Sequence, residues 1–322
     1  MDGFANNEAI EVLTFATYNV GLLSFKLFGV VEVFANPPYA IERFPKILEY
    51  LDKEISSSDV SMICIQECYS EFHANAIIQL LKDRLPYHAR HFNSPLLHSV
   101  SLKFHNGLLT LSKYPITNSY ILPLHKVSTV ERWLANKSHL ICTVQVPSVG
   151  DLLVIHVHTT AGGAVNPEHP DVDGDREDEL LQAWKVCEEF TSPRMALIIG
   201  DFNCGPEASA GNYEYILQKG FRDTFLEYHT TGERKLLSGE MCTWDPKNFL
   251  NTIGPHAHCP GQRCDHILLH SANTPKAWKV TNAKLLFQDA VVVLPGKDLL
   301  CTLSDHYGML VQLTKQQEEP QT

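Results

Sequence analysis

The hydrophobic positions of this chain fall into two kinds of segment that alternate along its length. Short runs rich in Val, Ile and Leu predict buried strands at Leu13–Val20, Val60–Ile65, Leu140–Val146, Leu152–His158, Ala196–Gly200, Cys264–Leu269 and Met309–Leu313. In other segments apolar residues recur every three or four positions, which predicts helices at Ile41–Ile55, Ile77–Leu81 and Arg176–Phe190. This alternation predicts an α/β fold.

No low-complexity linker divides the chain. Its 322 residues, 44% of them apolar, are enough for one large hydrophobic core. We therefore expect a single domain over residues 12–315, preceded by an N-terminal extension (1–11) and followed by a disordered tail (316–322). The longest apolar stretch, Val20–Ala35, contains charges and is too short to span a bilayer.

Charge and cysteine content restrict the function and the location of the protein. The formal net charge of −11 argues against a protein that grips nucleic acid, because such proteins usually carry a basic face. The nine cysteines are an odd number without framework-like spacing, which is typical of a reducing compartment. No secretory signal is visible at the N-terminus. The predicted location is cytoplasmic, with peripheral docking on membranes.

Polar residues follow several of the apolar runs directly. The strand ends of an α/β sheet are where residues from distant segments assemble a site. The residues in such positions are Asn19, Glu67, His158, Asp201, Asn203 and His306.

The segment Ile198–Asn203 ends a buried strand and presents a carboxylate and a carboxamide two residues apart. Residues i and i+2 of an extended segment point to the same side. Asp201 could therefore orient a water molecule while Asn203 donates a hydrogen bond to a phosphoryl oxygen. The alternative is an Asx turn that only ends the strand.

Two further segments carry side chains suited to metal binding and proton transfer. Glu67 ends an apolar strand, and hard divalent cations choose carboxylate oxygens, although a lone Glu in this position is often only solvated. His306 follows Asp305, and histidine is the side chain most often poised for proton transfer near neutral pH. Asp265 is a candidate for orienting its ring. The alternative is an ordinary loop histidine, one of 16 in the chain.

Two histidines lie on one face of the predicted strand Leu152–His158. His158 is nearer the strand end and is the better site candidate. His156 is expected to pack within the sheet.

Taken in order, these segments resemble the endonuclease/exonuclease/phosphatase superfamily, over residues 12 to 314. The resemblance implies a four-layer α/β/β/α sandwich of two packed mixed sheets, as in DNase I-like proteins. The motifs that carry it are Tyr18-Asn19, Gln66-Glu67, Asn106-Gly107 with Leu111–Pro115, Val157-His158-Thr159, Gly200–Asn203, Cys264-Asp265-His266 and Ser304-Asp305-His306.

The resemblance also implies roles for the candidate residues. Glu67, helped by Asn19 and supported by Asp305, is implied as the Mg²⁺ site, with Mn²⁺ or Co²⁺ as alternative ions. The domain is then catalytic, a metal-dependent phosphoric diester hydrolase.

The catalytic residues follow from the same resemblance. Asp201 is implied to position the attacking water and Asn203 to bind the scissile phosphate. His306, oriented by Asp265, is implied as the general base, and His158 contacts the phosphate or the leaving group.

The substrate is indicated by a finer resemblance. Cys242–Asn248 and Cys264–Ile267 are similar to segments of neutral sphingomyelinase and related phospholipase C sequences. The apolar segments Leu22–Val31 and Ala290–Gly296 could enter a lipid interface, or could simply be core. We expect hydrolysis of sphingomyelin to ceramide and phosphocholine at a membrane surface. The alternatives are an inositol-phosphate phosphatase or nuclease of the same superfamily, and a catalytically silent lipid-binding scaffold.

Two other segments carry potential metal ligands. Asp171–Asp175 resembles a calcium loop, but Arg176 stands where the EF-hand pattern has Gly and Gln182 where it has Glu. A zinc site would need an unusual ligand spacing, and its candidates are His256, His258, Cys259 and Cys264.

Overall fold

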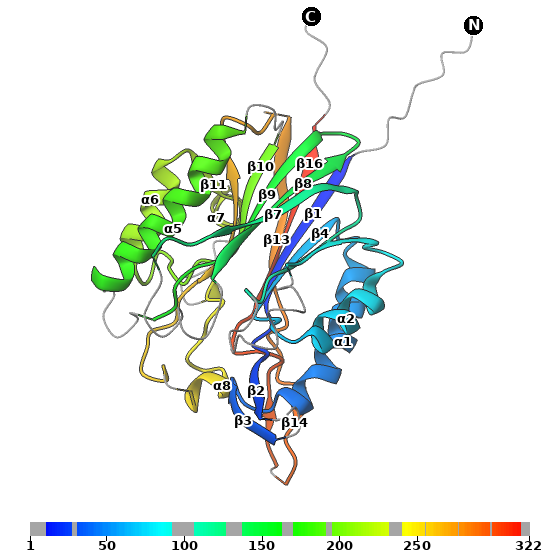
Figure 1. Cartoon of the computed structure of the whole chain (residues 1–322), viewed down its shortest axis with the longest axis vertical. Helices are drawn as coiled ribbons and strands as arrows, with labels where there is room; N and C mark the ends of the chain where they lie inside the picture. The colour runs from blue at the N-terminus through cyan, green and yellow to red at the C-terminus, as the bar shows by residue number, and fades with distance from the viewer. Residues whose placement is uncertain are drawn as a thin grey trace, which may run out of the picture.

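The computed structural model describes residues 11–27, 31–91, 106–126, 137–162, 170–190, 195–231, 240–254, 256–275, 277–296 and 298–316. Two six-stranded sheets pack face to face, and helices cover their outer faces (Figure 1). This arrangement confirms the predicted four-layer α/β/β/α sandwich.

The first sheet has the strand order β13-β16-β1-β4-β6-β5. β1 and β4 run parallel and the remaining neighbours are antiparallel, so the sheet is mixed. Helix α1 (Ala40–Ser57) lies between β1 and β4 in the chain, and α2 (Glu71–Leu81) follows β4. The strands are β1 (Val12–Asn19), β4 (Met62–Gln66), β5 (Tyr87–Ala89), β6 (Leu109–Ser112), β13 (Trp278–Leu286) and β16 (Gly308–Lys315).

The second sheet repeats this design with the order β11-β12-β10-β9-β8-β7. Its parallel pair is β9 and β10, and helix α5 (Pro170–Glu189) lies between them in the chain. The strands are β7 (Ile116–Pro123), β8 (Ser138–Val146), β9 (Gly150–His158), β10 (Met195–Asp201), β11 (Phe221–Asp223) and β12 (Asp265–His270). The other elements are α6 (Ala210–Gln218), α7 (Thr224–Thr231), α8 (Phe249–Thr252) and the hairpins β2 (Leu23–Leu27)–β3 (Val31–Asn36) and β14 (Val292–Val293)–β15 (Leu300–Cys301).

The central strands are buried on both faces, which explains why they read as continuous apolar runs. In β1, Leu13 and Phe15 pack between the two sheets, whereas Ala16 and Tyr18 pack beneath the helices. The side chains alternate because successive residues of a strand point to opposite faces. Helix α1 supplies the opposing stripe at helical spacing with Phe44, Ile47, Leu51 and Ile55.

Helix α5 differs from its prediction in where it begins. It starts at Pro170 rather than Arg176, since Pro suits the first helical position and acidic residues in the first turns complement the helix dipole. The stretch Asp171–Asp175 is therefore helical and does not form the calcium loop considered from the sequence. The backbone carbonyl of Asp173 accepts a hydrogen bond from Asn212 (2.8 Å).

Parts of other predicted segments lie outside the described residues. These are residues 1–10 of the extension, residues 317–322 of the tail, and residues 28–30 of the apolar segment Leu22–Val31. In the part of the chain that the structure describes, no helix is long and apolar enough to cross a membrane.

Candidate active site

Strand alternation brings the predicted site residues to one end of the space between the two sheets. Asn19 ends β1, His158 ends β9 and Asp201 ends β10. Each lies an even number of residues beyond side chains of its strand that pack between the sheets, so it points to the same inner face. Asp265 begins β12 and is the register partner of Asp201.

The side chain of Asn19 links the two sheets. Its Nδ2 donates to Glu67 Oε1 (3.1 Å) on the first sheet and to Asp201 Oδ2 (2.9 Å) on the second. Its Oδ1 accepts from the backbone N–H of Gly21 (3.0 Å), which fixes the orientation of the amide. Asn19 therefore holds two carboxylates in place while it is itself fully buried.

His306 is held by a buried carboxylate. Its Nδ1 lies 2.9 Å from Asp265 Oδ2, and its Nε2 lies 3.8 Å from Asp201 Oδ2. The backbone N–H of Asp265 donates to Thr243 Oγ1 (3.1 Å). Burial alone would lower the pKa of His306, but Asp265 and Asp201 together raise it well above its ordinary value.

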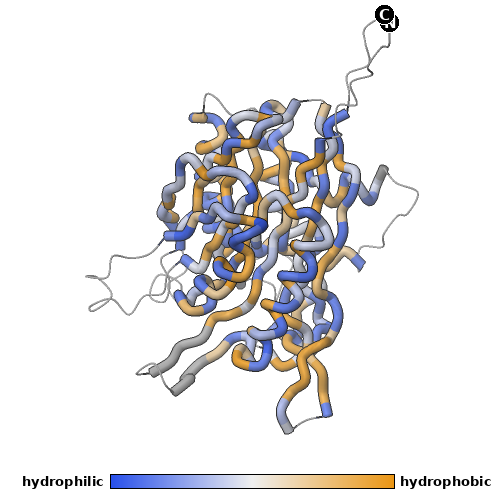
Figure 2. The backbone as a smooth tube through the Cα atoms, turned by 90° about the vertical axis from the view of Figure 1, so that its right-hand side faces the viewer, coloured by the Kyte–Doolittle hydropathy of each residue, from blue (hydrophilic) through white to orange (hydrophobic). Residues whose placement is uncertain are grey.

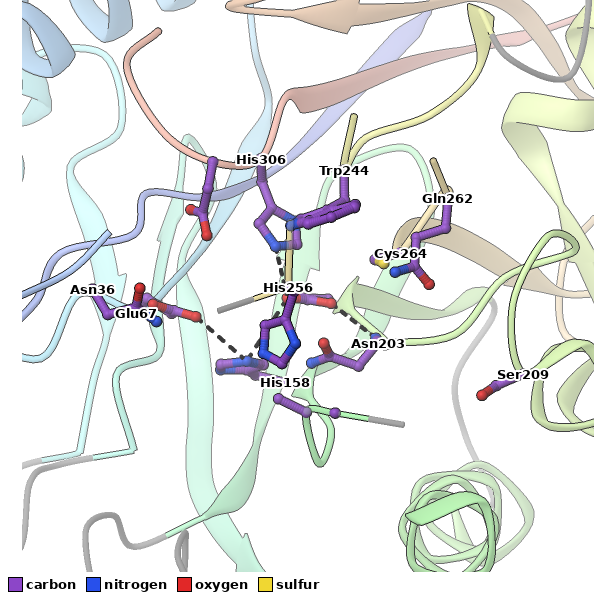
Figure 3. A pocket seen from close by; sticks show the side chains of 14 residues that line it. Asn36, Glu67, His158, Asn203, Ser209, Trp244, His256, Gln262, Cys264 and His306 are labelled. Carbon is purple, nitrogen blue, oxygen red and sulfur yellow. Dashed lines mark hydrogen bonds and ion pairs between the residues drawn. The ribbon is translucent and has the colours of Figure 1, made fainter. Parts of the chain in front are cut away.

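His158 faces the same group of carboxylates from the end of β9. Its Nε2 lies 3.8 Å from Glu67 Oε1 and 3.7 Å from Asp201 Oδ2 (Figure 3). The side chain is nearly buried, with 5% exposed. His156, two residues earlier, is fully buried in the sheet as expected.

The turn after β10 places Asn203 beside Asp201. Gly200 has φ +142°, and a Cβ there would overlap the carbonyl oxygen of Val157, so this position requires glycine. Asp201 Oδ1 accepts from the backbone N–H of Asn203 (2.8 Å). The Asx turn expected as the alternative is therefore present, and both of its side chains also line the pocket. Asn203 Nδ2 donates to the carbonyl of Thr159 (3.1 Å).

Most of the predicted residues line a single pocket. Glu67, His158, Asp201, Asn203, Asp305 and His306 form its walls (Figure 3). Asn19 and Asp265 lie fully buried behind it. The Asn106-Gly107 motif does not line it; Asn106 Nδ2 instead donates to Ser138 Oγ (3.0 Å).

Other residues of the pocket were not predicted as site residues. Trp244 lies in the segment Cys242–Asn248, whose resemblance supplies a signal, and His256 is among the zinc candidates. Asn36 and Gln262 also line the pocket, and nothing in the sequence marked them.

Arg43 was missed although it fixes the loops on the side of Glu67 and Asp305. It is fully buried, and its guanidinium donates hydrogen bonds to backbone carbonyls in three separate segments of the chain. The acceptors are the carbonyls of Val20, Gly21, Pro37, Pro38 and Leu303. The available signal was its place on the apolar stripe of α1, between Ala40 and Ile47.

The charge of the pocket fits a hard divalent cation. Glu67, Asp201, Asp265 and Asp305 crowd together, and burial, followed by the nearby Asp305, raises the pKa of Glu67 to about 7. A cation bound by carboxylate oxygens would relieve this repulsion, and Mg²⁺ is typically held by one or two carboxylates. The donor set therefore fits the magnesium ion expected from the sequence.

One group of potential ligands stands out geometrically among the described residues. Ligand atoms of Asp201, Asp265 and His306 lie within 4.8 Å of one another. His306 Nδ1 is already hydrogen-bonded to Asp265, so we regard this group as a hydrogen-bonded pair next to Asp201. The zinc candidates form no such group in the described part of the chain, and Cys259 and Cys264 pack against Trp244 in a small apolar cluster.

Comparisons with known proteins agree with this geometry. Residues 16–306 match the model of the Endonuclease/Exonuclease/phosphatase family. No curated protein sequence matches the chain significantly.

Several solved structures share the fold. Sphingomyelinase C from Streptomyces griseocarneus is 17% identical with a TM-score of 0.67, and the match covers 94% of this chain and 99% of that one. Beta toxin from Staphylococcus aureus, a structure with bound magnesium ions, is 16% identical with a TM-score of 0.67, covering 95% and 100%. D. rerio TDP2 with a single strand DNA product is 18% identical with a TM-score of 0.62, covering 94% and 98%.

Proposed function

Because this chain belongs to the endonuclease/exonuclease/phosphatase family, we propose that it is a Mg²⁺-dependent phosphodiesterase that hydrolyses sphingomyelin to ceramide and phosphocholine. One observation carries the proposal: a pocket at the shared edge of both sheets combines a carboxylate cluster with the buried Asp265–His306 pair. Attack on a phosphodiester builds negative charge on the phosphoryl oxygens and the leaving oxygen. A cation and neutral donors stabilise that charge without a covalent intermediate.

The metal-binding residues in this proposal are Glu67 and Asp305, with Asn19 orienting Glu67 through its amide. Bound Mg²⁺ supplies Lewis-acid stabilisation of the phosphate oxygens. The remaining carboxylates of the site then lie beside a neutralised centre. The charge of the ion would offset the burial and the nearby Asp305 that together raise the pKa of Glu67.

The other side chains of the site have separate roles around the substrate phosphate. His306 is the general base and accepts the proton of the attacking water at Nε2, since Asp265 occupies Nδ1. A bound cation would offset the carboxylates that raise the pKa of His306 in the metal-free protein, so that its ring would be neutral before the reaction. Asp201 lies 3.8 Å from the Nε2 of His306 and orients the water. His158 and Asn203 donate hydrogen bonds to the phosphoryl oxygens or to the leaving oxygen.

A lipid substrate is supported by exposed apolar side chains around the site. Val293, Leu299 and Leu300 of the β14–β15 hairpin are 69%, 47% and 51% exposed, and Ile253 after α8 is 48% exposed. Figure 1 shows β2, β3, α8 and β14 gathered at one end of the molecule, and in Figure 2 a hydrophobic hairpin reaches its lowest point. Because β2 follows the site residue Asn19 along the chain, this is the site end. Such a surface suits contact with a lipid interface.

The test is phosphocholine release from sphingomyelin vesicles with Mg²⁺ or with EDTA. His306→Ala should lower the rate of release by about 10²–10⁴-fold, while His88→Ala, exposed on the edge strand β5, should leave it unchanged. A Leu299→Ser/Leu300→Ser variant should lose activity on vesicles but keep activity on a soluble short-chain substrate.

Phosphatidylcholine vesicles, inositol phosphates and plasmid DNA are assayed in parallel. Cleavage of one of these in place of sphingomyelin would contradict the substrate assignment and retain the catalytic one. No turnover on any phosphoester would contradict both and favour a silent lipid-binding scaffold.

A further inference from the structure

A chain of hydrogen bonds crosses between the two sheets directly beneath the site. Gln66, the last residue of β4, and His156 of β9 lie on opposite sheets, and both are fully buried. Gln66 Nε2 lies 2.7 Å from His156 Nε2. Around this bond the two sheets meet through a large cluster of apolar side chains.

The direction of every bond in the chain can be assigned. The amide nitrogen of Gln66 can only donate, so His156 Nε2 accepts and its Nδ1 carries the hydrogen. That N–H then donates to Thr110 Oγ1 (3.0 Å). The hydroxyl of Thr17 donates to Gln66 Oε1 (3.2 Å), and Gln66 Nε2 also donates to the carbonyl of Cys64 (3.1 Å). Burial keeps the His156 ring neutral, with a pKa lowered to about 3.

The members of this chain immediately precede the site residues along their strands. Gln66 precedes Glu67 directly, and His156 precedes His158 by two residues. The site depends on atoms from the two sheets meeting at short distances, such as His158 Nε2 and Glu67 Oε1 at 3.8 Å. Apolar packing has no preferred direction, whereas a satisfied polar network specifies one arrangement. A displacement of 1 Å at a reacting centre can cost on the order of 100-fold in rate.

We propose that Gln66 and His156 are positioning residues that fix the two sheets relative to each other, and so hold Glu67 at the distance from Asp201 and His158 that metal and phosphate binding require. The inference rests on the proposed function for its catalytic readout. Its metal-binding readout needs no substrate.

A purely structural role can be separated from a positioning role. Removing one partner leaves the other buried and unsatisfied, whereas replacing both by apolar groups of similar shape removes most of that penalty. Gln66→Met and His156→Leu should each lower the urea midpoint of the metal-free protein. The double variant Gln66→Met/His156→Leu should recover part of that loss, because only the bond between the two residues is removed without an unsatisfied partner, while Thr17 and Thr110 still lose theirs.

The deciding measurement is Mg²⁺ affinity by titration calorimetry on these variants. We expect the double variant to bind Mg²⁺ about tenfold more weakly and to lose about 100-fold in kcat, although its urea midpoint is higher than that of either single variant. Return of Mg²⁺ affinity and kcat together with stability would overturn the proposal and leave the pair a structural role only.

Two further variants complete the experiment. His139→Leu is a matched control, because His139 is also fully buried in a strand but bonds to the backbone carbonyl of Glu179 (2.9 Å), away from the pocket. It should lower stability and leave Mg²⁺ affinity unchanged; an equal loss of affinity would overturn the proposal. Thr110→Val removes the acceptor of His156 Nδ1–H, together with a weak contact to Cys64 Sγ (3.7 Å), and leaves Gln66 and His156 in place. It replaces a variant at Gln66 or His156 that fails to fold, and it should weaken Mg²⁺ binding to a smaller extent; unchanged Mg²⁺ affinity would count against the proposal.

The inference and the proposed function can fail separately. Weakened Mg²⁺ binding in the double variant, with no sphingomyelin turnover by the unmodified protein, would retain the positioning role and contradict the substrate.

Discussion

Two clusters of buried charge behave in opposite ways: one surrounds Asp223 on the second sheet, and the other is the pocket at the shared edge of both sheets. Arg263 Nη1 lies 2.7 Å from Asp223 Oδ2, which also accepts from Tyr213 Oη (2.8 Å). Burial alone would raise the pKa of Asp223, but Arg263 holds it well below its ordinary range. In the pocket, no comparable cation accompanies Glu67 among its described hydrogen-bond partners, and its pKa rises to about 7.

This difference distinguishes a cluster that stabilises the fold from a site that binds a ligand. In the Asp223 cluster, the charge of the carboxylate is balanced by an arginine of the same chain. The pocket has more carboxylates than cationic side chains, so its negative charge is balanced only when a cation binds. Asp223 is hydrogen-bonded to an arginine, whereas Glu67 is hydrogen-bonded to the neutral amide of Asn19, and a divalent cation would supply the corresponding positive charge in the pocket.

The largest expected effect is on catalysis. His306→Ala should reduce kcat on sphingomyelin by about 10²–10⁴-fold, because it removes the general base. Asp223→Asn should leave kcat within a few-fold of the unmodified protein at a temperature where it stays folded. Comparable losses in both variants, measured by initial rates, would erase the distinction between the clusters.

The next effect is on stability. Asp223→Asn leaves Arg263 charged and buried, so it should lower the free energy of unfolding by about 3–5 kcal/mol. Asp59→Asn is the control, since Asp59 pairs with Lys113 on the surface with 87% of its side chain exposed, and should cost about 0–1 kcal/mol. Urea denaturation measures both. Equal effects would show that the buried pair is not the stronger one.

The opposite change in the free energy of unfolding is expected for a substitution in the pocket. Glu67→Gln removes a charge that the metal-free site repels, so in EDTA it should raise the free energy of unfolding by roughly 1–3 kcal/mol at pH 8. With Mg²⁺ present it should lose the stabilisation that the ion gives. Thermal unfolding with and without Mg²⁺ tests both, and destabilisation in EDTA would contradict the account of the pocket.

The smallest expected effect is a change of the free energy of unfolding with pH. The pKa of Glu67 rises on folding from an ordinary 4.5 to about 7, so between these values the folded protein holds more protons than the unfolded chain. By linkage, this contribution to stability is fully present below pH 4.5 and is lost as the pH rises through 7. In EDTA the unmodified protein should therefore lose stability over this window relative to Glu67→Gln. If the stability of the two proteins changes with pH in the same way, the raised pKa of Glu67 is contradicted.

Sequence patterns predicted the central strands and the place of the site because both follow from local rules. An apolar run such as Leu152–His158 predicts a strand buried on both faces, and the polar residue at its end falls at the sheet edge. Alternation then determines the face, so His158 and Asp201 meet although 43 residues separate them in the chain.

The remaining features depend on contacts that no local pattern encodes. The strand β7 is exposed along much of its length, so it lacks the apolar run that marks the central strands. Gln66 and His156 are 90 residues apart, and Arg263 and Asp223 are 40 apart. Each is an ordinary polar residue until folding brings it to its partner.

The most direct test of the central claim is hydrolysis of sphingomyelin in H₂¹⁸O with Mg²⁺, followed by mass spectrometry of both products. The account predicts that ¹⁸O enters phosphocholine and not ceramide, because water attacks phosphorus and the P–O bond to ceramide breaks. Absence of phosphocholine, or ¹⁸O in the ceramide hydroxyl, would contradict it.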